Sequence, residues 1–167
     1  MRMRAGSLMI EVAITVAISI AILAGTFATL ACVQRRCEDS QEKLVANSIA
    51  WDALWRAFNA KTSDVGYALD LNGGSYSNTV NLAAWDGVAG RVMPGAELLV
   101  TPALGNATAV LTLWVRRADE AVLPGGVHFV SEVRWRDRRS ATARWKSERL
   151  EALRSPLERD WRQGGER

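Results

Sequence analysis

The hydrophobic and polar positions divide the chain into an apolar stretch, an amphipathic stretch and a region of short alternating segments. The apolar stretch runs from Ala5 to Val33, and no charged residue occurs between Val12 and Val33. At about 1.5 Å per residue, a helix of this length matches the roughly 30 Å hydrocarbon core of a bilayer. We therefore expect residues 7–33 to form the transmembrane first half of a long N-terminal helix.

An amphipathic pattern follows the apolar stretch without an intervening Gly or Pro. Apolar and small side chains recur there at steps of three and four residues, the spacing of one helix face: Cys37, Ser40, Leu44, Ser48, Trp51, Trp55 and Phe58. This pattern predicts that the helix continues over residues 34–61. We expect Trp51, Trp55 and Phe58 to anchor it in the core of a folded domain.

Residues 62–154 show the shorter period of β-strands and are interrupted by turn signals such as Asn72-Gly73-Gly74 and Pro124-Gly125-Gly126. We expect strands at Val65–Leu71, Glu97–Thr101, Ala109–Arg117, His128–Arg136 and Ser140–Lys146, with a strand or irregular segment at Thr79–Trp85. The predicted fold class is α+β, with a long N-terminal helix packed on a small antiparallel sheet. A helical turn is expected over Glu148–Arg154, and residues 155–167 have the composition of a polar tail.

The clearest hairpin signal is the segment VRWRDRRSATARW, with a tight connection at Asp137-Arg138-Arg139. Strand alternation predicts that Val133 and Trp135 share one face with Ala143 and Trp145. The opposite face then carries the basic residues Arg134, Arg136, Arg144 and Lys146. Alternation alone thus explains part of the arginine cluster.

Composition excludes a disordered chain, because 49% of the 167 residues are apolar and seven are Trp. The formal charge of +3 is too small to identify a partner. Basic residues are concentrated in the last third of the chain, however, and a possible polyanion-binding patch comprises Arg134, Arg136, Arg138, Arg139 and Arg144. A membrane-tethered module that binds DNA or another polyanion is therefore one functional hypothesis.

The sequence contains no recognisable catalytic or cofactor motif. Phosphate-binding glycine loops, paired-carboxylate motifs, nucleophile elbows and metal-ligand spacings are missing from it. The single histidine, His128, is expected to be structural. Cys32 and Cys37 lie five residues apart on one helix, roughly 8–9 Å between Cα atoms, which is too far for a disulfide. We expect neither an enzyme nor a cofactor.

The N-terminus, MRMRAG, allows three interpretations. A secretory signal peptide fits the basic start, but its apolar core is usually shorter and does not begin with an acid. A lipoprotein signal would end at Thr29-Leu30-Ala31-Cys32 and anchor the protein at Cys32. The third interpretation places a cut after Gly6 and keeps the apolar helix in the mature protein.

The segment Gly6-Ser7-Leu8-Met9-Ile10-Glu11-Val12, followed by the apolar stretch, resembles the leader junction of type IV pilins and type II secretion pseudopilins. The resemblance covers residues 1–35 and implies a leader at residues 1–6 that a prepilin peptidase removes between Gly6 and Ser7. It also implies N-methylation of Ser7, although Phe is commonest at this position. In the family the acid at the position of Glu11 pairs with an N-terminal amine, its own or that of an adjacent subunit, during assembly.

The Arg- and Trp-rich hairpin also resembles the C-terminal part of V-type minor pilins. No cysteine follows Cys37, whereas major pilins often have a C-terminal disulfide, so the resemblance favours a minor subunit. It implies a bacterial inner-membrane protein with one span, a globular domain outside the cytoplasm and later transfer into a pilus or pseudopilus. The implied partners are other pilin or pseudopilin subunits, the prepilin peptidase and inner-membrane lipid.

Overall fold

The computed structural model describes residues 3–82, 90–98, 109–136 and 144–155. These residues form the helices α1 (Met3–Asn59) and α2 (Thr62–Leu71) and the strands β1 (Ser75–Asn81), β2 (Gly90–Met93), β3 (Ala96–Leu98), β4 (Ala109–Arg117), β5 (Val127–Arg136) and β6 (Trp145–Arg154). The predicted α+β class is confirmed at this level. The chain divides into two compact units, Met1–Gln41 and Glu42–Arg167, and α1 contributes to both.

The first unit is helical throughout its described residues. No break occurs in α1 until Asn59, so the predicted continuous helix is confirmed, and it ends two residues earlier than expected. The large apolar side chains from Met9 to Val33 are between 50 and 79% exposed in the isolated chain. By length and composition, α1 could span a membrane.

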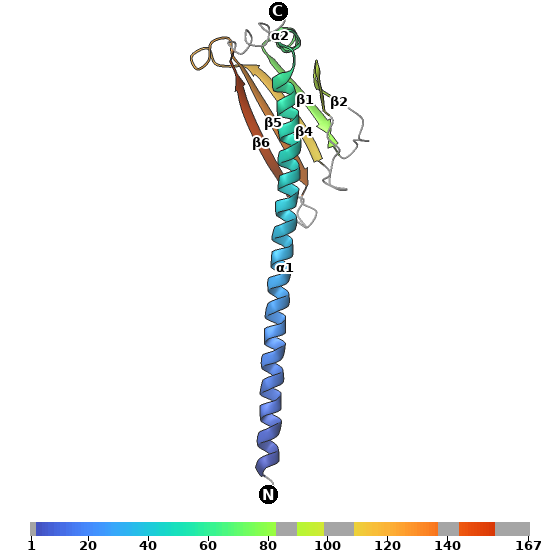
Figure 1. Ribbon diagram of the computed structural model, residues 1–167, viewed down its shortest axis with the longest axis vertical. Helices are drawn as coiled ribbons and strands as arrows, with labels where there is room; N and C mark the ends of the chain where they lie inside the picture. The colour runs from blue at the N-terminus through green and yellow to red at the C-terminus, as the bar shows by residue number, and fades with distance from the viewer. Residues whose placement is uncertain (1–2, 83–89, 99–108, 137–143, 156–167) are drawn as a thin grey trace, which may run out of the picture. The chain divides into compact units, whose positions relative to one another are not determined.

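The second unit is built on a four-stranded sheet in the order β1-β4-β5-β6, with every neighbouring pair antiparallel (Figure 1). The predicted strand Ala109–Arg117 is confirmed at both ends, and the strand predicted at His128 begins one residue earlier. A separate hairpin, β2–β3, turns at Pro94-Gly95, where Gly95 has φ of +76°. A positive φ is nearly free of cost only for glycine.

The two faces of the sheet differ in burial. The face that packs on α1, called the core face, contains Leu111, Leu113, Val115, Phe129, Val133 and Trp135, all at most 1% exposed. The opposite face, called the outer face, contains the alternate residues of the same strands, which include Arg116, His128, Val130, Arg134, Arg149 and Glu151. The β2–β3 hairpin adds Val92, Met93 and Leu98 to the core.

The face of α1 that packs on the sheet is rich in alanine. Ala46, Ala50, Ala53 and Ala57 are fully buried, with Ile49 and Leu54 beside them. The prediction that Trp51 and Trp55 anchor the core is wrong, because these side chains are 58 and 54% exposed and stack on each other instead. Small alanines let the helix lie close to the sheet, so the bulky rings occupy the opposite side of the helix.

Polar contacts join the C-terminal part of α1 to the sheet. Glu42 accepts hydrogen bonds from Trp135 Nε1 at 3.2 Å and Lys146 Nζ at 3.4 Å. Arg154 Nη1 donates to the carbonyl oxygens of Phe58 at 2.6 Å and Ala60 at 3.1 Å. These carbonyls lack helical partners at the end of α1, so Arg154 satisfies them from β6.

Two predicted elements are wrong. Val65–Leu71 was expected to be a strand but belongs to α2, whose buried residues Val65, Ala68 and Leu69 follow helical spacing. Glu148–Arg154 was expected to form a helical turn but pairs with β5 as part of β6. Good helix-forming residues are overridden there by the continuous strand partner.

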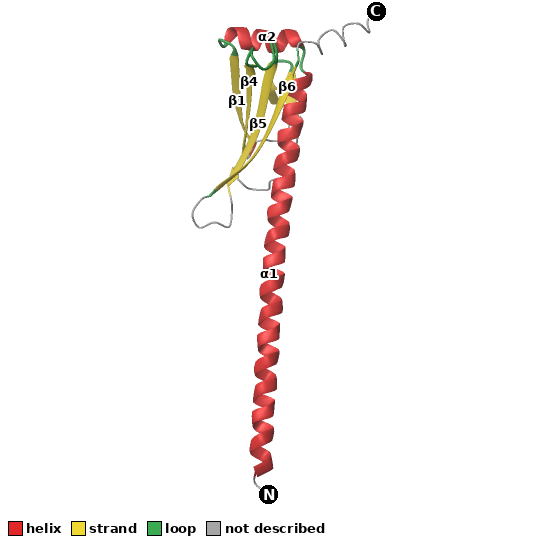
Figure 2. Cartoon of the chain, turned by 90° about the vertical axis from the view of Figure 1, so that its left-hand side faces the viewer, coloured by secondary structure: helices red, strands yellow, loops and turns green. Residues whose placement is uncertain are grey.

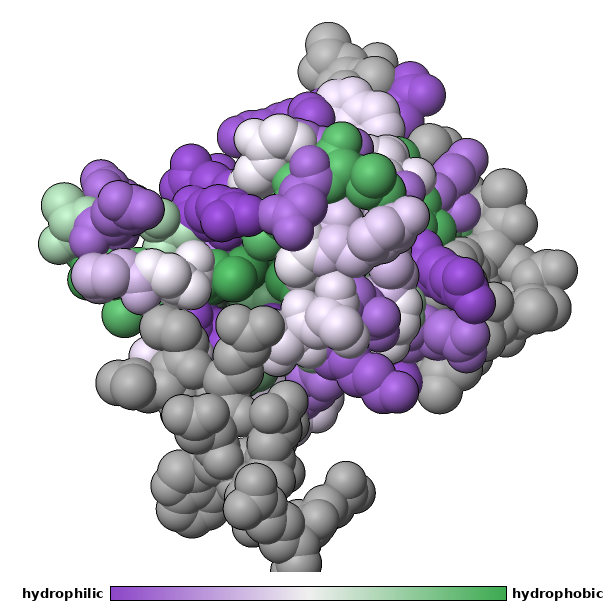
Figure 3. All heavy atoms as spheres, turned by 90° about the horizontal axis from the view of Figure 1, so that it is seen from above, coloured by the Kyte–Doolittle hydropathy of each residue, from purple (hydrophilic) through white to green (hydrophobic). Residues whose placement is uncertain are grey.

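Figure 2 shows α2 across the ends of the strands, and Figure 3, viewed from that end, shows hydrophilic residues around a smaller hydrophobic group.

Candidate functional site

The sequence motif at the N-terminus lies on helical backbone. Because α1 begins at Met3, the peptide bond between Gly6 and Ser7 is inside its first turns. Gly6 has the lowest helix propensity of any residue but proline, by about 1 kcal/mol relative to alanine, so it is the point at which this turn opens most easily. The predicted cleavage site therefore lies on a helix, at the residue where that helix is easiest to unwind.

Glu11 is the only charged residue between Arg4 and Arg35. From residue 9 to Val33, where the side chains are described, the hydroxyl groups are satisfied within the helix: Thr15, Ser19, Thr26 and Thr29 each donate to a carbonyl one turn earlier, at 2.8 Å. The carboxylate of Glu11 is therefore the one polar side chain of residues 9–33 that requires a partner from outside the helix when the segment is in lipid.

The predicted polyanion patch is only partly described. Arg134 and Arg136 lie exposed on the outer face of β5, and Arg144 is exposed just before β6. Arg138 and Arg139 lie outside the described residues. The guanidinium carbon of Arg134 is 5.7 Å from the ring centroid of Trp145, a cation–π contact on the outer face.

The register of the last hairpin differs from the prediction. Arg136 pairs with Trp145 and Trp135 pairs with Lys146. Trp145 is therefore on the outer face with the arginines, and Lys146 is on the core face beside Glu42. The predicted tight turn placed the returning strand at Ser140, whereas β6 begins at Trp145, so the faces assigned to Trp145 and Lys146 were wrong.

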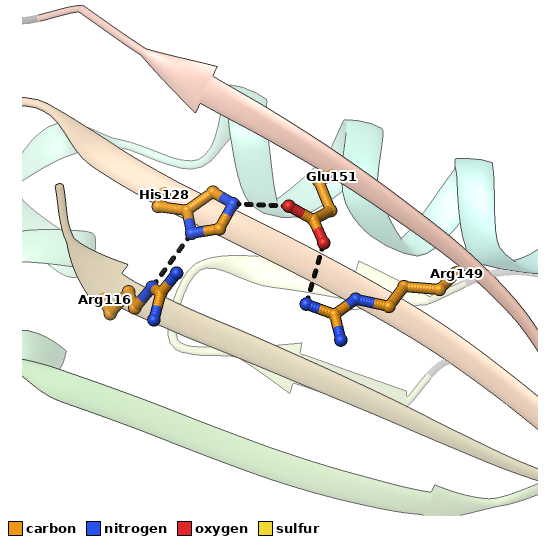
Figure 4. Close-up of polar contacts among 4 residues, drawn as sticks. All are labelled: Arg116, His128, Arg149 and Glu151. Atoms are coloured by element: carbon orange, nitrogen blue, oxygen red, sulfur yellow. Dashed lines mark hydrogen bonds and ion pairs between the residues drawn. The ribbon is translucent and has the colours of Figure 1, made fainter. Parts of the chain in front are cut away.

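Sequence reasoning missed a row of polar contacts across β4, β5 and β6 (Figure 4). Arg116 Nε donates to His128 Nδ1 at 2.9 Å, His128 Nε2 lies 3.1 Å from Glu151 Oε2, and Arg149 Nη2 lies 2.7 Å from Glu151 Oε1. The hydrogen bond from His128, followed by the nearby Arg149, lowers the pKa of Glu151 below its usual value. His128 was expected to be structural, and its two ring contacts across strands agree with that expectation.

The cysteines and acidic residues are the remaining candidates for a metal site. Cys32 and Cys37 are free and exposed. Within the described part of the chain, no group of three or more His, Cys, Asp or Glu residues is arranged to hold a metal ion.

Comparison with known proteins identifies no relative: no protein-family model, curated protein or solved structure matches the chain.

Proposed function

We propose that the chain is the precursor of a minor pilin- or pseudopilin-like subunit, which is processed after Gly6 and assembled from the membrane into a filament. The observation that carries this proposal is the single acid, Glu11, at the start of an exposed apolar helix and five residues after Gly6. A cut after Gly6 creates a new amine at Ser7, one helical turn from Glu11. No other charge in the apolar stretch competes for that amine.

The energetics of Glu11 support a paired rather than an isolated carboxylate. A charged side chain at the centre of a membrane helix costs about 2.5–3.5 kcal/mol on insertion scales. An amine about 4 Å away, at an effective dielectric near 20, recovers roughly 4 kcal/mol. The two energies are similar, so the carboxylate is tolerated in an apolar environment when an amine is close.

The rest of α1 also supports the proposal, because its surface suits contact with lipid first and with the helices of other subunits later. Apolar side chains cover all sides of α1 from Met9 to Val33, and Gly25, Thr26 and Thr29 provide small positions where a second helix can approach closely. The sheet unit, with its own core, provides the part of the subunit that stays in water. Under this proposal the sheet unit lies outside the cytoplasm, and the partner subunits contact the helix.

The proposal is tested by substituting Glu11→Ala in cells that assemble the filament. The variant is expected to insert in the membrane and to lose its leader normally, but its incorporation into sheared filaments should fall at least about tenfold, since about 1.4 kcal/mol of lost pairing is a factor of ten. Glu38→Ala, an acid on the same helix beyond the apolar stretch, is the control and should assemble normally. Normal incorporation of the Glu11 variant would contradict the proposal.

A second candidate function is polyanion binding, favoured by the exposure of Arg134, Arg136 and Arg144. The full chain in detergent should then bind duplex DNA with an affinity that falls steeply as salt is raised. Arg134→Gln together with Arg136→Gln should weaken binding and reduce the salt dependence, while Arg56→Gln, an arginine of α1 paired with Asp52, should change neither. An absence of binding at low salt would remove this candidate.

A further inference from the structure

His128 is the only histidine of the chain, and its residue exposure is 8% on an outer face that is otherwise rich in exposed charges. Both ring nitrogens have partners on neighbouring strands. Arg116 of β4 contacts Nδ1, and Glu151 of β6 contacts Nε2 (Figure 4). The imidazole therefore links three strands through one ring.

The partners fix the protonation state of this ring. Arginine does not lose its proton in proteins, so the contact with Arg116 requires Nδ1 to accept a hydrogen bond. The remaining ring proton is then on Nε2 and is donated to Glu151. His128 is neutral in this arrangement, with one tautomer selected from both sides.

A second proton on His128 is incompatible with the contact to Arg116. An N–H group at Nδ1 would face the N–H group of Arg116 Nε, and two positive charges would meet. At Nε2 the change has the opposite effect, because an imidazolium donates a stronger hydrogen bond to the carboxylate of Glu151. Protonation thus breaks one interstrand contact and strengthens the other.

We propose that His128 is a pH-sensitive switch in the outer face of the sheet: acid adds a proton at Nδ1, releases the side chain of Arg116 and tightens the contact with Glu151. The proton comes from solvent, and Arg116 keeps its own. The acid form adds one positive charge to the outer face and frees the guanidinium of Arg116, which otherwise donates its Nε hydrogen bond to Nδ1.

The charges around the ring act in opposite directions. Arg116 on β4 opposes protonation, Glu151 on β6 favours it, and Arg149 behind Glu151 weakens that favourable effect. On β1, the residue in the same row is the uncharged Ser75, and on β5 the nearest acid of the outer face is Glu132, two rows away. Each of the two direct partners therefore gives a variant with a predicted direction.

The test is nuclear magnetic resonance of the full chain in detergent micelles, with nitrogen-15 in histidine and arginine and without a histidine tag. Because the chain has one histidine, its ring signals need no assignment. Above neutral pH, Nδ1 is expected to show the shift of an unprotonated nitrogen and Nε2 that of a protonated one. On acidification, the Nε signal of Arg116 should change with the same midpoint as the ring signals.

The Nε signal of Arg117 is the internal control. Arg117 is the next residue of β4, points to the opposite side of the sheet and pairs with Asp70, so its signal should not follow the titration of the ring. A ring protonated at Nδ1 above neutral pH would overturn the proposal. An Arg116 signal that does not change as the ring titrates would also overturn it.

Two variants separate the switch from simple strand packing. Glu151→Gln removes the charge that favours the imidazolium and should move the midpoint to lower pH. Arg116→Gln keeps a hydrogen-bond donor but removes the opposing charge, and should move the midpoint to higher pH. Arg117→Gln should leave the midpoint unchanged. Equal midpoints in all three variants would mean that the ring does not sense these partners, and the switch would be rejected.

Discussion

Ser131 illustrates how a single polar atom affects stability. Its side chain is fully buried on the core face of β5, and its hydroxyl has no hydrogen-bond partner among the described residues. A buried hydroxyl without a partner costs about 1–3 kcal/mol. We expect Ser131→Ala to raise the free energy of unfolding by about 1 kcal/mol, because it removes that cost and leaves only a small void. Urea titration of the full chain in detergent measures this, with Ser147→Ala on the exposed side of β6 as the neutral control.

Gly95 is a position where a side chain meets a direct obstacle. A Cβ at this residue would collide with the carboxylate of Asp64 in the first turn of α2, and its φ is already +76°. Gly73 has a similar φ of +64° but open space around it, so it isolates the backbone effect. Gly95→Ala should lower the melting temperature more than Gly73→Ala, and Asp64→Ala should restore part of the difference. Equal losses in the two glycine variants would contradict the close approach.

The proposed functional residues Gly6 and Glu11 are recognisable from the sequence because their signal is local in the chain. Glu11 stands out because it is the one acid of an apolar stretch, and Gly6 because it ends the basic N-terminal segment. The partners of His128 could not be predicted, because Glu151 lies 23 residues later and faces the ring only through the register of β5 with β6. The predicted tight turn gave a different register and hence different neighbours.

At the scale of elements, the two faces of α1 should respond differently to substitution. Ala53 is fully buried against the sheet, so Ala53→Leu should destabilise the fold by about 1–3 kcal/mol through overpacking. Trp51 is 58% exposed, and Trp51→Ala should cost less than about 1 kcal/mol, because mainly its ring stacking on Trp55 is lost. Denaturant unfolding of both variants measures the contrast. A larger loss for the tryptophan would restore the core role that the sequence pattern predicted.

Glu151 gives the β5–β6 pair a predicted pH dependence. Its pKa is lowered by the hydrogen bond from His128 and then by Arg149, so the ionised form is favoured in the folded state. The stabilisation is present above the pKa of the unfolded chain and disappears as pH falls through the lower, folded value. The melting temperature of the natural protein should exceed that of Glu151→Gln at neutral pH, and the two should converge only as the pH falls through the lowered pKa of Glu151. Glu120→Gln, in the exposed turn before β5, is the control and should not show this convergence.

The elements differ in how well the sequence predicts them. The strands β4 and β5 contain apolar and β-branched residues at alternating, buried positions. This pattern is specific for strands, so the sequence predicts both nearly to the residue. The strand β6 was missed because WKSERLEALR consists largely of helix formers, and only pairing with β5 along its whole length makes it a strand. The helix α2 was missed because its short apolar pattern fits both periods, and Gly66 weakened the helical signal.

Across the whole molecule, the unit Met1–Gln41 and the unit Glu42–Arg167 differ in whether their apolar side chains are buried within the unit. The second unit buries an apolar core of its own, whereas the apolar side chains of the first unit are exposed along the helix. We therefore expect the full chain to remain in the membrane fraction after washing with high salt and alkali. A chain that lacks residues 1–35 should be released, and release of the full chain would exclude membrane insertion.

Processing between Gly6 and Ser7, on which the proposed pilin-like precursor depends, can be read from the mass of the mature protein. The chain is co-expressed with a prepilin peptidase, purified in detergent and analysed by intact mass spectrometry and N-terminal sequencing. We expect loss of residues 1–6, a mature N-terminus at Ser7, and retention of all six residues in a Gly6→Leu variant. A mature N-terminus at Cys32, or an unprocessed chain with Met1 in place, would contradict the proposal.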